Sequence, residues 1–83
     1  MQKTNIMSIQ VKLFGVLADV VGQPELLLKN IGDTDSLKEK MISDFPKLKM
    51  HSFVVAVYKK ISNENQVLSN GDVVALLPPF AGG

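Results

Sequence analysis

An uninterrupted apolar run at 73–77, VVALL, followed at once by two prolines, restricts the fold more than any other feature. A strand without polar alternation is typical of the middle of a sheet, where both of its faces are covered. Pro78 and Pro79 have no N–H to donate to a neighbouring strand, so pairing should end where they begin. We therefore expect the last strand to be central, with residues 78–83 leaving the sheet as an extended tail.

Three shorter patterns precede this run in the first third of the chain. Residues 8–14, SIQVKLF, alternate between apolar and polar side chains, which predicts a half-buried strand. Residues 15–22, GVLADVVG, indicate a short helix that ends at Gly22. Residues 24–30, PELLLKN, are expected to form a second strand.

The best helix pattern lies at 34–46, TDSLKEKMISDFP. Its apolar stripe consists of Leu37, Met41 and Phe45, with Ile42 beside it. Ser36 and Glu39 have the spacing of a capping box, and the acidic residues at 33–35 suit the positive end of the helix dipole. Capping is thus the expected role of these carboxylates, in preference to acid–base catalysis. Pro46 is expected to end the helix.

The second half of the chain completes the topology. Residues 53–60, FVVAVYKK, predict a third strand, residues 61–68 an irregular segment with a short edge strand, and residues 70–72, NGD, a turn. With the main helix between the second and third strands, this order predicts an α+β fold of the β-grasp (ubiquitin-like) type. Its mixed sheet would carry the main helix across one face, together with the short first helix. Right-handed crossovers favour a final strand parallel to the first and beside it.

The predicted domain covers residues 7–77. Residues 1–6 are polar and without pattern, so they are expected to be disordered. The segment from Met7 begins the first strand so directly that we take Met7 as a hypothetical natural start. Residues 78–83 form the tail.

Composition excludes several classes of function. The net charge is +1, and all nine basic residues are lysine, so the guanidinium fork that grips phosphate is missing and nucleic acid is not an expected partner. The absence of cysteine removes disulfides, zinc–thiolate sites and thiol catalysis. His51, the only histidine, is expected at the surface or in a turn, so no metal site is predicted. Neither a membrane span nor a signal peptide is apparent, which favours the cytoplasm.

The tail suits the transport of a covalently bound group. Six extended residues reach about 20 Å. Phe80 and Ala81 offer side chains for recognition, whereas Gly82 and Gly83 let another protein's backbone close tightly around them. The reactive group at the tip is the carboxylate of Gly83, which is ionised near neutrality and unreactive until it is activated from outside. As an acyl-adenylate it could accept sulfur to become a thiocarboxylate, or an amine to form an amide.

Three stretches resemble the small subunit of molybdopterin synthase, the MoaD-like sulfur carriers: VKLFGVLADVVG, VAVYKK and NGDVVALLPPFAGG. The resemblance covers roughly residues 7 to 83, and the ending is its most specific part. It implies that Gly83 is adenylated and then converted to a thiocarboxylate, and that Gly82 is a sterically required spacer. It also implies that the remaining tail residues, Pro78, Pro79, Phe80 and Ala81, contact the partner.

The same resemblance implies the partners. The small subunit would insert its tail into the large, catalytic subunit, in a heterotetramer of two small and two large subunits. There it would donate sulfur to a cyclic pterin monophosphate precursor of the molybdenum cofactor. A MoeB-like adenylating enzyme would consume ATP, and a further enzyme would donate the sulfur. No permanently bound cofactor and no catalytic side chain are expected on the chain itself.

Four positions depart from the family pattern. Val16 and Ala18 stand where charged residues are frequent, Tyr58 stands where asparagine is common, and Phe80 replaces a smaller aliphatic residue. These changes concern partner surfaces more than chemistry. We interpret Tyr58 as an ordinary exposed strand residue.

Three other functions fit parts of the pattern. Thiamine-pathway sulfur carriers also end in two glycines, although they are usually shorter and usually lack the double proline. A ubiquitin-like protein modifier would join its tail to lysines of a target by an isopeptide bond. A non-covalent adaptor would not need the last two glycines at all.

Overall fold

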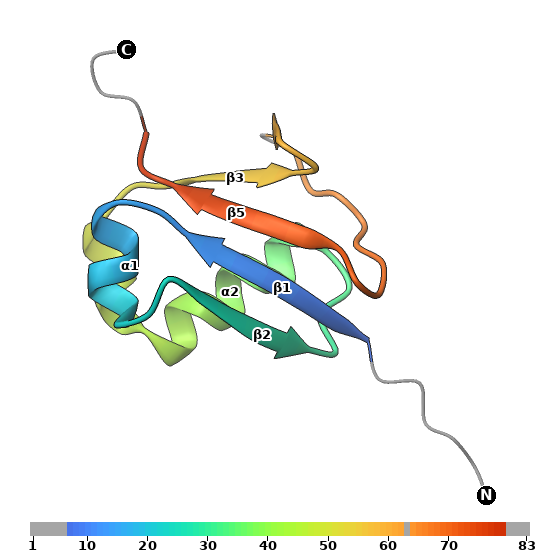
Figure 1. Cartoon of the computed structure of the whole chain (residues 1–83), viewed down its shortest axis with the longest axis horizontal. Helices are drawn as coiled ribbons and strands as arrows, with labels where there is room; N and C mark the ends of the chain where they lie inside the picture. The colour runs from blue at the N-terminus through green and yellow to red at the C-terminus, as the bar shows by residue number, and fades with distance from the viewer. Residues whose placement is uncertain (1–6, 63, 80–83) are drawn as a thin grey trace, which may run out of the picture.

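A five-stranded mixed sheet with two α-helices dominates the computed structural model, which describes residues 7–62 and 64–79 (Figure 1). The strands are β1 (Ser8–Leu13), β2 (Glu25–Lys29), β3 (Val54–Val57), β4 (Lys60–Ser62) and β5 (Val73–Leu77). Their order in the sheet is β2-β1-β5-β3-β4, with β5 parallel to β1 and antiparallel to β3. The predicted β-grasp fold, with the last strand central and parallel to the first, is confirmed.

Helix α1 (Val16–Val21) follows β1, and helix α2 (Thr34–Asp44) joins β2 to the second half of the sheet. Gly22 ends α1 as predicted, in the left-handed conformation with φ 93°, and its N–H donates to the Ala18 carbonyl at 2.8 Å. Pro46 stops α2 and starts a 3₁₀ helix, η1 (Pro46–Met50), which the sequence patterns did not predict. No helix in the described ranges is both long and apolar enough to cross a membrane.

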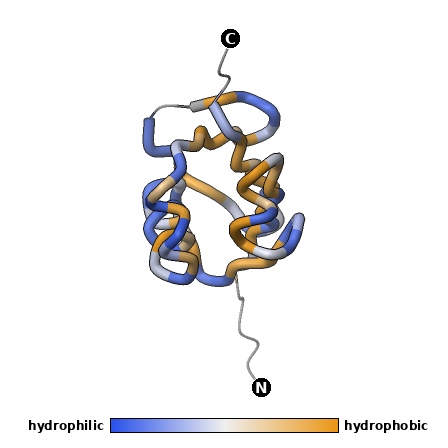
Figure 2. Tube along the Cα trace, turned by 90° about the vertical axis from the view of Figure 1, so that its left-hand side faces the viewer, coloured by the Kyte–Doolittle hydropathy of each residue, from blue (hydrophilic) through white to orange (hydrophobic). Residues whose placement is uncertain are grey.

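One core joins the helices to the sheet. The fully buried side chains are Ile9, Val11, Leu17, Leu37, Met41, Leu48, Val74 and Leu76. They come from two strands, from both α-helices and from η1, and each strand contributes alternate residues. The tube in Figure 2 accordingly alternates between hydrophobic and hydrophilic stretches along the chain. The apolar stripe expected of α2 is confirmed, since Leu37 and Met41 are buried and Phe45 packs against the core.

The residue that caps the start of α2 differs from the prediction. Asp33, and not Ser36, is the N-cap, because its Oδ1 accepts a hydrogen bond from the Ser36 N–H at 2.9 Å. The capping box predicted at Ser36 and Glu39 is therefore wrong, because the N-cap lies three residues before Ser36. A second correction concerns β3, which ends at Val57 instead of continuing to residue 60, because Tyr58 and Lys59 form the turn into β4. The short edge strand expected within 61–68 exists, but it starts at Lys60.

The largest correction concerns the two faces of β5. The apolar run predicted a strand covered on both sides, yet only Val74 and Leu76 are buried beneath the helices. Val73 is 37% exposed, and Ala75 and Leu77 are half-buried. We call the side of the sheet that carries these three residues the open face. The predicted central position of β5 is thus correct. The expectation that both of its faces are covered holds for one face only.

Candidate functional site

The candidate site begins at the C-terminal end of β5, where the tail leaves the sheet. Leu77 makes the last pair of the strand, with Val54 of β3. Next to it, the Phe14 N–H donates to the Leu76 carbonyl at 3.1 Å. These bonds attach the end of the strand to both of its neighbours.

Pro78 packs against the turn between β1 and α1. A Cβ placed on Gly15 would lie 3.0 Å from Pro78 Cγ, and Gly15 also has φ 60°, which side chains rarely tolerate. Only glycine therefore lets the turn approach the proline so closely. Pro78 is half-buried and Pro79 is exposed, so the chain leaves the body between these two residues.

The structure describes only two of the six tail residues that were predicted to form the site. Pro78 and Pro79 lie at the end of the central strand, as expected. Phe80, Ala81, Gly82 and Gly83 lie outside the described residues, so their predicted roles stay predictions.

A hollow on the open face lies beside the tail base, by which we mean Leu77 and Pro78, and the sequence patterns did not predict it. Its volume is about 410 Å³, and its lining residues are Lys12, Phe14, Ala56, Tyr58, Lys59, Val73 and Ala75. Its floor contains Ala56 of β3 and Ala75 of β5, which are direct partners in the sheet. Two small residues opposite each other leave a depression between larger neighbours. The available sequence signal was the apolar character of Val73 and Ala75, two of the three open-face residues of β5.

Tyr58 forms one wall of this hollow. It is 68% exposed, which agrees with its interpretation as a surface residue, but it belongs to a turn and not to a strand. Its hydroxyl donates to Oδ1 of Asp72, a carboxylate that is only 6% exposed. The hydrogen bond to Asp72, reinforced by burial and by the negative charge, raises the pKa of Tyr58 above its ordinary value. Asp72 Oδ2 also accepts the Ser69 N–H at 2.8 Å, which fixes the carboxylate.

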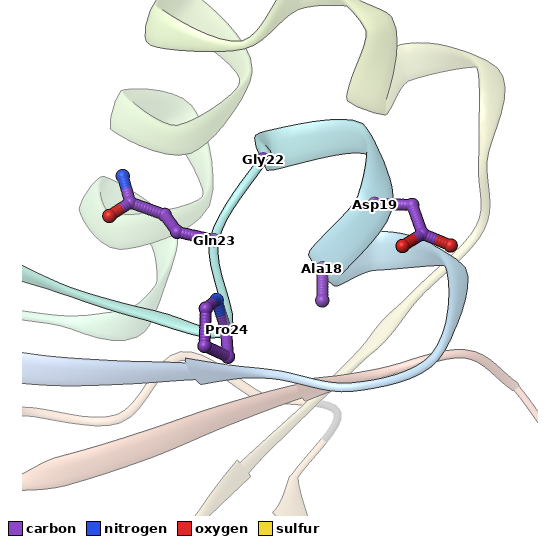
Figure 3. Close-up of a pocket in the computed structure, with 5 residues that line it drawn as sticks. All are labelled: Ala18, Asp19, Gly22, Gln23 and Pro24. Atoms are coloured by element: carbon purple, nitrogen blue, oxygen red, sulfur yellow. The ribbon is translucent and has the colours of Figure 1, made fainter.

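A second, shallower hollow lies beside α1. Its lining comprises Ala18, Asp19, Gly22, Gln23 and Pro24 (Figure 3). In the close-up the Asp19 carboxylate and the Gln23 amide point in different directions, so no set of polar groups converges there. Within the described ranges, no group of three or more His, Cys, Asp or Glu is placed to hold a metal ion.

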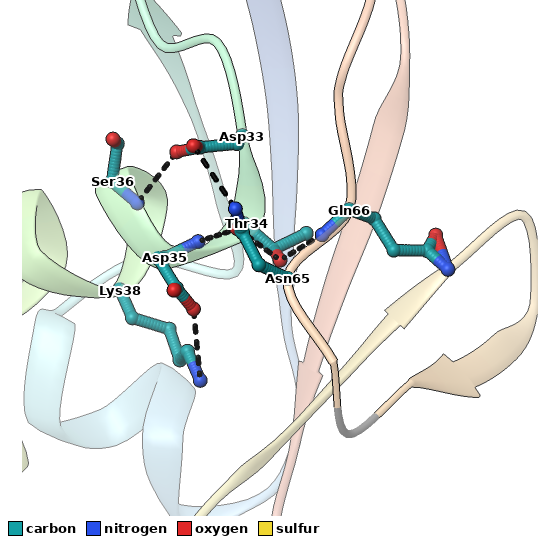
Figure 4. Close-up of polar contacts among 7 residues, drawn as sticks. All are labelled: Asp33, Thr34, Asp35, Ser36, Lys38, Asn65 and Gln66. Atoms are coloured by element: carbon teal, nitrogen blue, oxygen red, sulfur yellow. Dashed lines mark hydrogen bonds and ion pairs between the residues drawn. The ribbon is translucent and has the colours of Figure 1, made fainter.

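The acidic residues at the start of α2 belong to a hydrogen-bonded network that joins the helix to the loop before β5 (Figure 4). Asn65 donates to Asp33 Oδ2 at 3.2 Å and accepts the Asp35 N–H at 2.8 Å. The Gln66 N–H donates to Thr34 Oγ1 at 2.9 Å. The bonds from Ser36 and Asn65 keep the pKa of Asp33 below its ordinary value. The expected capping role is confirmed for Asp33, whereas the Asp35 carboxylate pairs with Lys38 at 3.8 Å.

One comparison with known proteins identifies a family. A model described as the ThiS family matches residues 11–83. No curated protein sequence matches the chain.

Several solved structures share the fold. Small archaeal modifier protein 1 from Methanosarcina acetivorans has a TM-score of 0.79 at 21% identity, over 96% of this chain and 100% of its own. Putative molybdopterin converting factor subunit 1 from Pyrococcus furiosus has a TM-score of 0.82 at 21% identity, over 89% and 99%. A chain in the complex of subunits 1 and 2 of the molybdopterin-converting factor from Helicobacter pylori has a TM-score of 0.69 at 25% identity, over 93% and 100%.

Proposed function

Because the chain belongs to the ThiS family and has the fold of ThiS- and MoaD-like sulfur carriers, we propose that it carries sulfur on Gly83 for molybdenum cofactor biosynthesis. The observation that carries the proposal is the extent of the family match, which continues through the double glycine at 82–83. The described tail base supports it, since the central strand ends there and Pro78 is held against Gly15.

The chemistry would take place at the terminal carboxylate. Its oxygen attacks the α-phosphorus of ATP in an adenylating enzyme, which releases pyrophosphate and forms a glycyl-adenylate. Sulfur delivered at the sulfide level by a donor (HS⁻) then attacks the carbonyl carbon, so that AMP leaves and a thiocarboxylate remains. Gly82 contributes by its lack of a side chain, because a narrow enzyme channel must admit the backbone. Catalytic groups would come from the partners, and this chain would supply the handle.

The proposed recipient is a large catalytic subunit. The Helicobacter pylori structure supports this choice, because it is a complex of subunit 1, which resembles this chain, with subunit 2. Phe80, Ala81 and the two prolines would contact the walls of that subunit's tail-binding channel. Attack of the thiocarboxylate sulfur on the cyclic pterin monophosphate precursor would form an acyl–sulfur bond. Hydrolysis of that bond by water would leave the sulfur on the precursor and regenerate the carboxylate on Gly83.

Protein modification is a second candidate. Small archaeal modifier protein 1 has nearly the same fold over the whole chain, and its name describes a modifier. The first step would be the same adenylation, with a lysine amine of a target as the acceptor. A thiamine-pathway carrier would also share this step, but the double proline favours the molybdopterin pathway.

Intact-mass spectrometry of the protein purified from its own cells tests the proposal. We expect a species heavier than the unmodified chain by the difference between one sulfur and one oxygen atom. Deletion of Gly83 should remove this species while the folded body is unchanged, because the described core ends at Leu76. Conjugates to other proteins without the sulfur species would support the modifier. Neither product, in cells that make molybdenum cofactor, would refute covalent carriage.

A further inference from the structure

The turn before β5 contains a chemically labile pair of residues. Residues 69–72, which we call the Asn70 turn, close with the Asp72 N–H donating to the Ser69 carbonyl at 3.0 Å. Within it, Asn70 is followed by Gly71, and this is the only Asn-Gly pair in the chain. Asparagine is thermolabile because the next backbone nitrogen can attack its side-chain carbonyl carbon. A following glycine has no Cβ to hinder that attack.

The reaction needs no reagent other than water. Hydroxide removes the Gly71 amide proton, and the nitrogen attacks Asn70 Cγ. An N–Cγ bond forms, the Cγ–Nδ2 bond breaks, and ammonia leaves with a proton from water. Water then opens the five-membered imide. Opening at Cγ leaves aspartate, whereas opening at the main-chain carbonyl leaves isoaspartate, in which the backbone runs through the former side chain.

One residue of β1 holds both reacting groups in the folded domain. The Ser8 N–H donates to Asn70 Oδ1 at 2.8 Å, and the Gly71 N–H donates to the Ser8 carbonyl at 2.8 Å. Loss of the Gly71 proton breaks the second bond, and movement of the amide toward the nitrogen breaks the first. The Ser8 N–H also polarises the amide, but this cannot lead to attack while the Gly71 proton is held.

These two bonds lie where the structure can open locally. Asn70 and Gly71 are exposed, and Ser8 is the first residue of β1. Exposed hydrogen bonds at the ends of elements open with a small free energy. Asp72, in contrast, is 6% exposed, and its carbonyl accepts the Gln10 N–H at 3.0 Å. The turn can therefore detach from Ser8 while β5 stays paired.

We propose that Asn70 is a site of spontaneous conversion to aspartate and isoaspartate, and that its bonds and those of Gly71 to Ser8 set the rate in the folded domain. Isoaspartate adds a methylene to the main chain just before the central strand. Either product adds a carboxylate two residues from the buried Asp72. Both changes weaken the turn, so the conversion limits the lifetime of the folded domain. No tail residue takes part, and the inference is independent of the proposed function.

The test is incubation of the full chain at mildly alkaline pH, followed by mass spectrometry of the peptide that contains Asn70. Conversion raises its mass by the difference between a hydroxyl and an amino group. The capped peptide acetyl-Ser-Asn-Gly-Asp-amide is the unfolded reference. The folded chain should convert about ten- to a thousandfold more slowly than this peptide. Equal rates, or no conversion within that range, would overturn the proposal.

Hydrogen exchange measures the same opening in the original chain. Exchange of the Gly71 N–H also requires its bond to Ser8 to break, so it should be slowed by a factor similar to that of the conversion. A Gly71 amide that exchanges as fast as in the peptide would contradict the proposal. Asn70→Gln should abolish the mass change, because the larger six-membered ring closes far more slowly. A mass change that persists in this variant would mean that another residue reacts.

Two variants separate local opening from unfolding of the whole domain. Ser8→Pro removes the donor to Asn70 but keeps the carbonyl that binds Gly71, and proline is tolerated at the first residue of a strand. Conversion should be about three- to tenfold faster, the factor that one net hydrogen bond is worth. Gly15→Ala, which destabilises the domain just beyond the other end of β1, should leave the rate unchanged.

The remaining outcomes would each overturn part of the proposal. Slower conversion in Ser8→Pro would mean that the Ser8 N–H activates the amide. Equal acceleration in Gly15→Ala would assign the reaction to global unfolding. The isoaspartate form, separated by ion exchange, should have a lower denaturation midpoint than the original chain. An equal midpoint would contradict the limit on the lifetime of the domain.

Discussion

The two faces of β5 differ in what they contribute, although their residues are equally apolar. On one face Val74 and Leu76 are completely buried against the helices. On the other, Val73 and Ala75 line a hollow open to solvent, and Ala75 is separated from the tail by two strand residues. Burial of the first face stabilises the body, whereas the second face leaves apolar residues partly exposed to solvent. The comparison teaches that an unbroken apolar run does not by itself mean that both faces of a strand are covered.

The largest effect should come from the covered face. Leu76→Ala removes a fully buried side chain and leaves a cavity, so the free energy of unfolding should fall by about 2–5 kcal/mol. The matched change on the open face, Val73→Ala, should cost less than about 1 kcal/mol. Chemical denaturation followed by circular dichroism measures both. Similar losses at the two positions would break the comparison, because they would mean that the open face is also covered.

An intermediate effect is expected where β5 ends, at Gly15→Ala. The variant combines an unfavourable positive φ with a contact 3.0 Å from Pro78 Cγ, and strain of this kind costs on the order of 1–3 kcal/mol. Gly22→Ala is the control, since it also has a positive φ but has no atom within contact range. Only Gly15→Ala should shift the NMR signal of Leu77. If both variants shift it equally, Pro78 is not held by the turn.

The smallest effect should come from Asp33→Ala at the cap of α2. The denaturation midpoint should fall less than for Leu76→Ala, because two surface hydrogen bonds are lost and no cavity forms. The folded-state pKa of Asp33 lies below 3.8, so its contribution is present above that pH and is lost as the pH falls through the folded-state pKa. The difference between the variant and the original chain should therefore vanish in strong acid.

The sequence predicted the framework of the fold because its strongest signals are local and periodic. The alternation in β1, the stripe of Leu37 and Met41, and the stop at Pro78 each have one physical explanation. The cap was misplaced because aspartate and serine are both good N-caps, and only the geometry selects Asp33.

The candidate site was less predictable. The run 73–77 carries the same apolar signal on both faces, so it does not reveal which face the helices leave uncovered. The turn at Tyr58 and Lys59 was missed because neither residue type favours a positive φ, and the compensating bond to Asp72 comes from a residue 14 positions away. The chemistry of Gly83 was deduced from its carboxylate, and it lies outside the described residues.

The central position of β5 also governs when the domain can form. Of the five strands, β5 is the last to emerge from the ribosome, yet it is the one that joins β1–β2 to β3–β4. Until it arrives, the nascent chain holds two antiparallel pairs with no shared backbone bonds, and pairing across such long sequence separations is slow. Assembly of the complete sheet should therefore wait until β5 has been made, and the strand that leads into the tail is also the one that completes the body.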